Sequence, residues 1–403
     1  MCVLIGINQL GFGALVPVMP LYAQGFGVTQ WAIGMAVAAY GLARFATGVP
    51  AGQLADWLGR RPTLAIGGLV SALGNLWCAV AASFPEFVIA RFVAGAGAAL
   101  VLNAGAIVLA DISTPERRGR IMAIYQGTFL FAVGVGPLPG GLIAEHHGLA
   151  APFIAYAVAG SLASCIACFA VHETRDLGRD LGRDLGRDLG RDFRAGTAPV
   201  AAPVTPESRP PLAQQMRLMF AQVGFRLVSG VGFTNAFVRT GALFTLVPLI
   251  GSTGIGLSAT RIGIGLAAGS VLGLLMVYPA GVLVDRFGRK TVIVPATVMS
   301  GAAMALFGIA PTFFWFFVAC VIWGVASSIG GAAPAAYAAD SAPAGMNATA
   351  MSAYRTLSDL GYVLGPIGLG LIADALGTTS ALALSAVLLL SMGIVFGRWA
   401  PET

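Results

Sequence analysis

The 403-residue chain is too apolar and too weakly charged for a soluble globular protein. Apolar residues make up 57% of it, charged residues 10%, and its mean hydropathy is +0.84, whereas soluble domains carry about 25% charged residues. This composition excludes a set of soluble domains and indicates an all-α integral membrane protein.

Twelve apolar stretches are long enough to cross a bilayer, which takes about 20 residues per helix. They cover residues 2–23, 31–55, 62–83, 86–110, 121–144, 150–171, 226–250, 261–284, 291–311, 315–339, 350–373 and 378–398. The first stretch lacks the small-residue cleavage site of a signal peptide, so we expect it to remain as the first transmembrane helix.

The basic residues alternate between the two sides of this predicted bundle. Arg60 and Arg61, the arginines at 117–120, the segment 175–217 and the basic residues at 286–290 fall in connections on one side, whereas the connections on the other side contain no Lys or Arg. By the positive-inside rule, the first side is cytoplasmic. We therefore expect both termini and the central segment in the cytoplasm, in a bacterial inner membrane, and the charge of +6 does not indicate a nucleic-acid partner.

The chain contains an internal repeat with an offset of 229 residues. GQLADWLGRRP at Gly52 matches GVLVDRFGRKT at Gly281, and the same offset pairs Asp111 with Asp340 and Gly136-Pro137 with Gly365-Pro366. Six helices repeated in the same topology form a parallel repeat, typical of transporters whose substrate lies between two halves.

The repeat also defines three regions. We predict an N-terminal six-helix bundle at 1–174, a cytoplasmic linker at 175–219 and a C-terminal six-helix bundle at 220–403. The linker starts with tandem RDLG units from Arg175 and continues with a Pro- and Ala-rich run. Each unit contains a Gly that disfavours a helix by about 1 kcal/mol, so the linker is predicted to be a solvated spacer.

GQLADWLGRR resembles the signature that the major facilitator superfamily carries between its second and third helices. The resemblance implies a cytoplasmic gate, with short Gly turns and an Asp that caps a helix or holds an Arg. The residues assigned to this gate are Gly52, Asp56, Gly59, Arg60 and Arg61, with Asp111 as acidic partner, and the second copy Gly281, Asp285, Gly288 and Arg289.

Two further motifs resemble the drug:proton antiporter group of this superfamily. Arg91, in ARFVAGAGAAL, matches the fourth-helix motif linked to proton-coupled transport, and GVGPLPGG matches the antiporter motif of the fifth helix. The small residues of the second motif allow close helix packing and its proline bends the helix. The packing residues are Gly136, Pro137, Gly140 and Gly141, with Gly365 and Pro366 in the looser second copy. The first helix departs from the group, since it has Asn8 and Gln9 where many members carry an acid.

Five charges lie inside predicted helices: Arg44, Arg91, Arg239, Arg355 and Asp359. Such residues are costly in a membrane and are candidates for substrate or ion binding. Arg355 and Asp359 are spaced i, i+4, so they share a face and can pair. Asp359 is either a proton carrier or a member of a structural ion pair.

We expect a secondary active transporter that works by rocker-switch alternating access, most plausibly in proton-coupled export of small drug-like or metabolite molecules. The alternative is a transporter that binds organic anions, sugars or other metabolites with its intramembrane arginines. A channel is a less favoured alternative. No ATP-binding motif or enzyme signature is present. We expect no metal, no cofactor and a monomer that uses the proton gradient.

Overall fold

The computed structural model describes residues 1–403 except 114, 172, 175–211, 332, 344–345 and 403. The described residues form helices and no strand. In the first half these are α1 (Cys2–Leu15), α2 (Met19–Gln24), α3 (Gln30–Leu58), α4 (Arg60–Val80), α5 (Phe84–Ile112), α6 (Pro115–Val135), α7 (Pro137–His147) and α8 (Ala151–Ala170).

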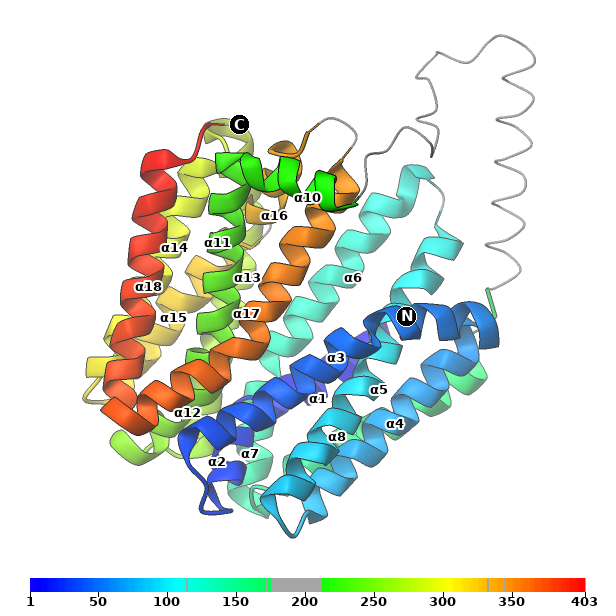
Figure 1. Cartoon of the computed structure of the whole chain (residues 1–403). Helices are drawn as coiled ribbons and strands as arrows, with labels where there is room; N and C mark the ends of the chain where they lie inside the picture. The colour runs from blue at the N-terminus through cyan, green and yellow to red at the C-terminus, as the bar shows by residue number, and fades with distance from the viewer. Residues whose placement is uncertain (114, 172, 175–211, 332, 344–345, 403) are drawn as a thin grey trace, which may run out of the picture.

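The second half contains the equivalent helices (Figure 1). They are α11 (Val223–Val238), the π-helical η2 (Arg239–Leu246), α12 (Val247–Leu249), η3 (Ile250–Gly254), α13 (Ala259–Phe287), α14 (Lys290–Ile309), α15 (Phe313–Ile329), α16 (Ala333–Asp340), α17 (Asn347–Leu376) and α18 (Thr378–Trp399). A short helix, α10 (Leu212–Ala221), precedes them. The predicted linker 175–219 is therefore helical from Leu212, and its RDLG units lie outside the described residues.

Within the described part of the chain, each of the twelve predicted stretches consists mostly of helical residues. Among the described residues, ten helical segments are long and apolar enough to cross a membrane, and α3 is an eleventh when its two bent parts count as one span. α1 is shorter, with 14 residues. Together with α2 it extends to Gln24, and so covers the first predicted stretch.

Several of these helices are broken where the sequence contains proline or glycine. α3 bends by 51° between Gly48 and Pro50, because a proline inside a helix removes a hydrogen bond and clashes with the preceding turn. The fifth span divides into α6 and α7 at Gly136, immediately before Pro137. The seventh span is π-helical from Arg239, a distortion often found at functional sites.

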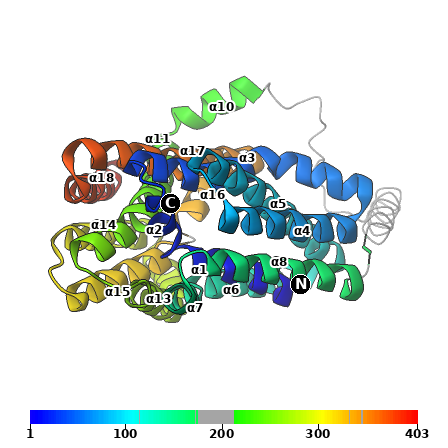
Figure 2. The ribbon, with the colours of Figure 1, turned by 90° about the horizontal axis from the view of Figure 1, so that it is seen from below.

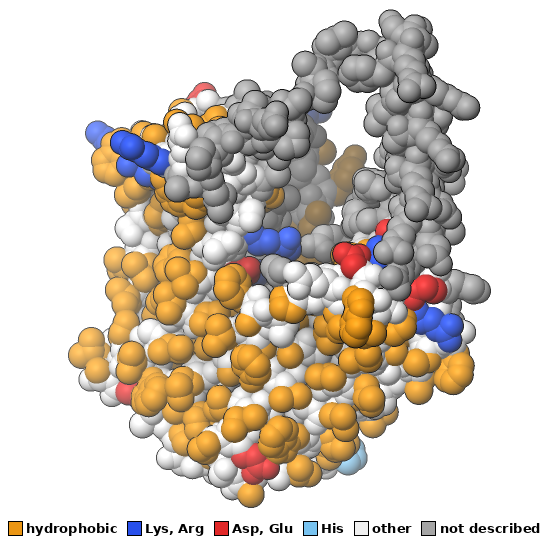
Figure 3. Space-filling view, turned by 45° about the vertical axis from the view of Figure 1, so that its right-hand side comes forward, with side chains coloured by type: hydrophobic (Ala, Val, Ile, Leu, Met, Phe, Trp, Pro, Cys, Tyr) orange, Lys and Arg blue, Asp and Glu red, His pale blue; other side chains and the backbone are white. Residues whose placement is uncertain are grey.

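The surface between the ends is apolar. Large side chains such as Leu73 (56% exposed), Val158 (64%), Leu275 (63%) and Ile394 (63%) lie on the outside of both halves. On the face shown in Figure 3, hydrophobic side chains are spread over most of the described surface and only a few charged side chains lie among them. A lipid environment makes this exposure favourable, as expected for an integral membrane protein.

The two six-helix halves touch along two pairs of helices. α3 packs on α17, and α6 with α7 packs on α13; Figure 2 shows these pairs side by side. From there the halves diverge toward the end of the molecule that carries the C-terminus and α10 (Figure 1). We call this end the linker end and the opposite one, where the halves meet, the far end.

Candidate functional site

A polar cavity of about 730 Å³ opens in the C-terminal half, toward the linker end. It is lined by parts of α11, α14, α15, α16 and α17. Its polar lining residues are Asn235, Arg239, Thr297, Ser300, Ser327, Ser352, Tyr354, Arg355, Ser358 and Asp359, and Trp323 contributes an aromatic ring. The size and the few charged groups suit a small organic molecule.

Three of the predicted membrane charges meet in this cavity. Arg355 and Asp359 come from one face of α17, as their i, i+4 spacing predicts, and Arg239 comes from the first residue of η2. The spacing allows a direct ion pair between Arg355 and Asp359, but none of the ion pairs within 4.0 Å among the described residues joins them. Both side chains are partly accessible in the cavity, so each charge can be solvated without the other.

Arg44 adds a further positive charge from the opposite half. It is half-buried on α3 and lies near enough to Asp359 for electrostatic attraction. Asp359 is therefore the acid among three arginines, Arg44, Arg239 and Arg355. This part of the site has an excess of positive charge.

Arg91 lies apart from the large cavity, in the core of the N-terminal half. Its side chain is 3% exposed, and its guanidinium carbon is 4.5 Å from the centre of the Tyr40 ring. Its Nε and Nη1 have no hydrogen-bond partner. The cation–π contact offsets part of the cost of burying this charge. Arg91 also lines a small cavity of about 20 Å³, together with Phe244 and Tyr362 of the other half.

Asn8 and Gln9 are also buried, with 0% and 2% exposure. The hydroxyl of Tyr156 donates a hydrogen bond of 3.4 Å to Oδ1 of Asn8, and Nδ2 of Asn8 has no partner. Asn8 therefore contacts Tyr156 in the core of the N-terminal half, and neither Asn8 nor Gln9 lines the large cavity. The seven candidate substrate and coupling residues form two groups in place of one site.

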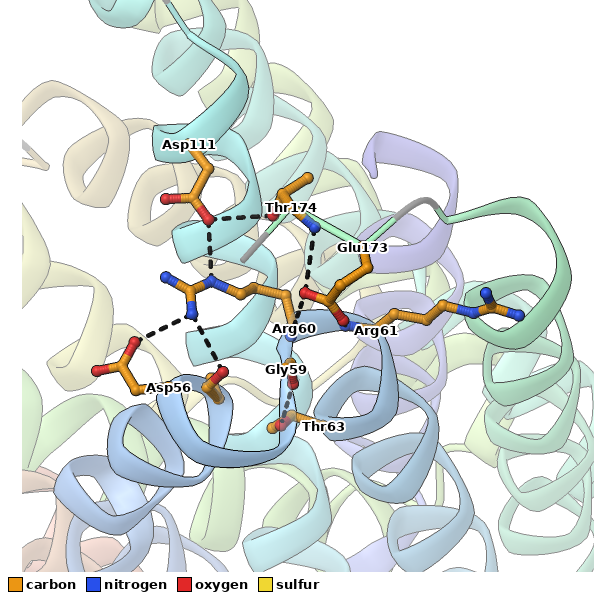
Figure 4. Close-up of polar contacts among 9 residues, drawn as sticks. Asp56, Gly59, Arg60, Arg61, Thr63, Asp111, Glu173 and Thr174 are labelled. Carbon is orange, nitrogen blue, oxygen red and sulfur yellow. Dashed lines mark hydrogen bonds and ion pairs between the residues drawn. The ribbon is translucent and has the colours of Figure 1, made fainter. Parts of the chain in front are cut away.

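At the linker end, the predicted gate residues form a network inside the N-terminal half (Figure 4). Nε of Arg60 lies 2.9 Å from Oδ2 of Asp111, and Nη1 of Arg60 lies 3.1 Å from Oδ1 of Asp56. Thr174 also donates to Asp111, at 3.0 Å. Asp111 is thus in contact with Arg60, as predicted for the acidic partner of this cluster.

Glu173, which the motif comparison does not include, caps α4. Its carboxylate accepts hydrogen bonds from the backbone N–H groups of Arg60 (2.9 Å) and Arg61 (3.1 Å), the first two residues of that helix. The Arg61 side chain donates to the carbonyl of Cys168. A signal for Glu173 existed in the repeat, which pairs it with Glu402, but its role depends on the fold.

The second copy of the gate is simpler. Nε of Arg289 lies 2.8 Å from Oδ2 of Asp340, which matches the Arg60–Asp111 pair in the first copy. Gly59 (φ 108°) and Gly288 (φ 81°) both have the positive φ that favours glycine. Gly52 and Gly281 lie inside α3 and α13 with free space where a Cβ would lie, so the turn itself requires glycine at 59 and 288 and not at these two positions. The side chain of Asp285 lies outside the described residues.

At the far end, the packing residues bring the two halves into close contact. A Cβ on Gly141 would clash with the backbone of Ala259 and Thr260, and one on Gly370 with the backbone of Gln30 and Trp31. Likewise, the carbonyl of Pro137 fills the space beside Gly263, and the carbonyl of Pro366 the space beside Gly34. Each of these contacts has its equivalent at the 229-residue offset.

The remaining motif glycines pack within each half. A Cβ on Gly136 would lie 2.7 Å from Cα of Gly13, and one on Gly140 would clash with Ala14, both in α1. Gly365 makes the same kind of contact with Phe237 on α11. Small residues at these positions let neighbouring helices approach closely enough to seal this end.

His146 and His147 lie at the end of α7 with ring centres 6.5 Å apart. Within the described part of the chain, no three His, Cys, Asp or Glu residues gather as a metal site. The five cysteines are free.

The chain is similar to known membrane transporters over its whole length. The family model described as "Major Facilitator Superfamily" matches residues 1–258 and 228–403. An MFS-type transporter of the archaeon Methanocaldococcus jannaschii is 23% identical over 396 residues, which cover 96% of this chain and 94% of that protein. The quinolone resistance protein NorA of Staphylococcus aureus is 29% identical over 171 residues, which cover 41% of this chain and 42% of that protein.

Solved structures of transporters have the same fold. A D-xylose-proton symporter aligns over 100% of this chain and 97% of its own, with a TM-score of 0.72 and 16% identity. A peptide transporter of the POT type in complex with alafosfalin aligns over 99% and 93%, with a TM-score of 0.75 and 13% identity. At these identities the likeness shows the fold and carries no information on the transported molecule.

Proposed function

Because the chain belongs to the major facilitator superfamily, we propose that it is a proton-coupled exporter of small drug-like or metabolite molecules. It works as a monomer without a bound cofactor, by rocking its two halves so that the central site faces each side of the membrane in turn. Exchange of protons for substrate supplies the energy. The location is the bacterial inner membrane, with the linker end in the cytoplasm.

The observation that carries this proposal is the combination of an open and a closed end. The 730 Å³ cavity opens toward the linker end, while the far end is sealed by helix pairs that meet backbone to backbone. The basic connections predict that the linker end is cytoplasmic. A carrier that collects its substrate from the cytoplasm must adopt such an inward-facing state. The relation of the halves by the 229-residue repeat supports a rocking mechanism.

The direction of transport and the coupling ion are each assigned from a single observation. The partial likeness to NorA, whose name says that it confers quinolone resistance, favours export of drug-like molecules. Asp359 is the acid in the cavity lining, so we assign it the proton. Arg355 and Arg44 attract the charged carboxylate, so a move of these arginines away from Asp359 when the site changes sides would favour its protonation.

Counterflow in proteoliposomes tests the transport activity. The purified chain is reconstituted, loaded with one compound of a panel and offered the same compound in labelled form, with and without a pH gradient. The proposal requires saturable exchange that the gradient drives uphill. Conductance that does not saturate with substrate would identify a channel. Exchange that the pH gradient does not change would exclude proton coupling.

Asp359→Asn tests the assignment of the proton. The variant is expected to lose proton-driven accumulation by at least about tenfold while it still binds and exchanges substrate, because the amide keeps the size and polarity of the carboxylate but cannot carry a proton. Thr356→Ala, at an exposed position of the same helix outside the cavity lining, is the matched control and keeps driven transport. Unchanged driven transport in Asp359→Asn would exclude this residue as the carrier.

Transport of organic anions is the second candidate function. It is favoured by the excess of Arg44, Arg239 and Arg355 over one acid around the cavity, since guanidinium groups bind carboxylates and phosphates in a forked geometry. The same counterflow panel separates the two candidates when it contains lipophilic cations and organic acids of matched size. Exchange of the acids alone, lost in Arg239→Gln, would establish the second.

A further inference from the structure

The closed far end contains a charged contact between the halves that no motif includes. Asp374, in the last turn of α17, accepts hydrogen bonds from the backbone N–H groups of Gln30 (2.8 Å) and Trp31 (2.9 Å). These are the first two residues of α3, in the other half. A carboxylate of the C-terminal half therefore caps a helix of the N-terminal half.

This cap replaces one that α3 lacks. The residue before the helix, Thr29, makes no capping hydrogen bond with its side chain. A helix start leaves four backbone N–H groups without partners inside the helix. Asp374 satisfies two of them and places a negative charge at the positive end of the helix dipole, which is favourable. Thr378 adds a third contact across the halves, donating to Oε1 of Gln30 at 3.1 Å.

The opposite half offers an equivalent acid. Glu145 lies 229 positions before Asp374, in the last turn of α7. Its carboxylate lies near Ser258 and Thr260 at the start of α13, close enough for electrostatic attraction to their hydroxyl and N–H groups. This contact is looser, because the Thr260 hydroxyl makes no hydrogen bond of normal geometry and Ser258 already caps α13 through the N–H of Arg261 (3.4 Å).

Neither Asp374 nor Glu145 is stabilised by its position in its own helix. Each lies in the last turn of its own helix, where a negative charge opposes the helix dipole. Neither takes part in an ion pair among the described residues. Each instead faces the start of a helix in the other half, four residues after a glycine, Gly141 or Gly370, that allows the close approach.

We infer that Asp374 and Glu145 are reciprocal latches that hold the far gate closed in the inward-facing state, and that Asp374 is the stronger of the two. Each latch joins the halves only while the helix ends meet, so both break when the far end opens. The inference rests on the alternating access of the proposed function, but it does not depend on which molecule is transported or on proton coupling.

Distance measurements at the far end test the latches. Ser83→Cys and Thr312→Cys place spin labels on exposed residues of one far-end connection in each half, at the 229-residue offset, and neither side chain caps its helix. The five native cysteines are replaced by alanine or serine. Pulsed electron paramagnetic resonance in lipid nanodiscs then reports the ratio of wide to narrow distances.

Asp374→Asn is expected to raise this ratio about fivefold, the effect of losing one helix cap. Glu145→Gln should raise it about twofold, since its contact is looser. Asp374→Glu keeps the charge and should stay within about twofold of the parent. Glu86→Gln is the matched control: Glu86 is also an acid at the far end and is partly exposed, but it accepts from Nε1 of Trp77 (2.6 Å) and the N–H of Ala82 (3.0 Å) in its own half.

An unchanged distance distribution in a well-folded Asp374→Asn variant would overturn the inference. An equal shift in Glu86→Gln would overturn it too, because it would reveal a general effect of charge at this end. The measurement needs no transported compound. A shift in Asp374→Asn together with an absence of transport for every compound would retain the latches and reject the proposed function.

Discussion

The linker end and the far end of this protein use the same kinds of residue in opposite ways. At the linker end, the ion pairs Arg60–Asp111 and Arg289–Asp340 each join residues of one half. At the far end, Asp374 and the glycines beside it join residues of different halves. Contacts within a half make each bundle rigid, whereas contacts between halves decide whether an end is open.

The difference also explains where small residues are needed. Where two helices meet without charged side chains between them, their backbones must approach closely to seal the end, which Gly34 and Gly141 permit. An open end has no such requirement, and Gly52 and Gly281 near the linker end face free space. The comparison predicts that the same Gly→Ala change has large effects at one end and small effects elsewhere.

Gly34→Ala should have the largest effect. Its Cβ would clash with the Pro366 carbonyl of the other half, and overpacking of this kind costs about 1–3 kcal/mol. We expect transport to fall by about tenfold and the far-end labels to move to wide distances. Gly127→Ala is the control, because nothing lies within 4 Å of that position. Equal transport by the two variants would show that the far seal does not depend on this contact.

Asp111→Asn should destabilise the linker end without opening the other end. Asp111 accepts from both Arg60 and Thr174 and its side chain is 13% exposed, so the change should lower the free energy of unfolding by about 2 kcal/mol. Asp56→Asn should lower the free energy of unfolding by less than about 0.5 kcal/mol, because the side chain of Asp56 is 73% exposed. Unfolding titrations of both variants check the order, and equal losses would contradict it.

Deletion of residues 179–186, two RDLG units, should have the smallest effect. Their Asp–Arg pairing gains only a few tenths of a kcal/mol in a helix, which the Gly in each unit cancels. We expect transport to remain within about twofold of the parent. A large loss in a variant that inserts normally would mean that the linker takes part in gating, and the two ends would then not differ as described.

Some of the site could be read from the sequence because its signal is local or repeated. The positions of the spans follow from hydropathy, and the glycines at 59 and 288 from the signature turn. The common face of Arg355 and Asp359 follows from their spacing, but their separation in a wide cavity does not. The burial of Arg91 over Tyr40 and the partners of Asn8 depend on the packing of α1, α3, α5 and α8, which no spacing along the chain encodes.

The sequence by itself determined the membrane class, the positions of the apolar stretches, the 229-residue repeat and the family resemblance, because these depend on composition, periodicity and short motifs. Only the tertiary structure decided which end is closed and which charges share a cavity. It also decided that Asp374 caps α3 across the two halves. These properties depend on contacts between residues hundreds of positions apart, and a transporter must make and break such contacts while its sequence and its helices stay the same.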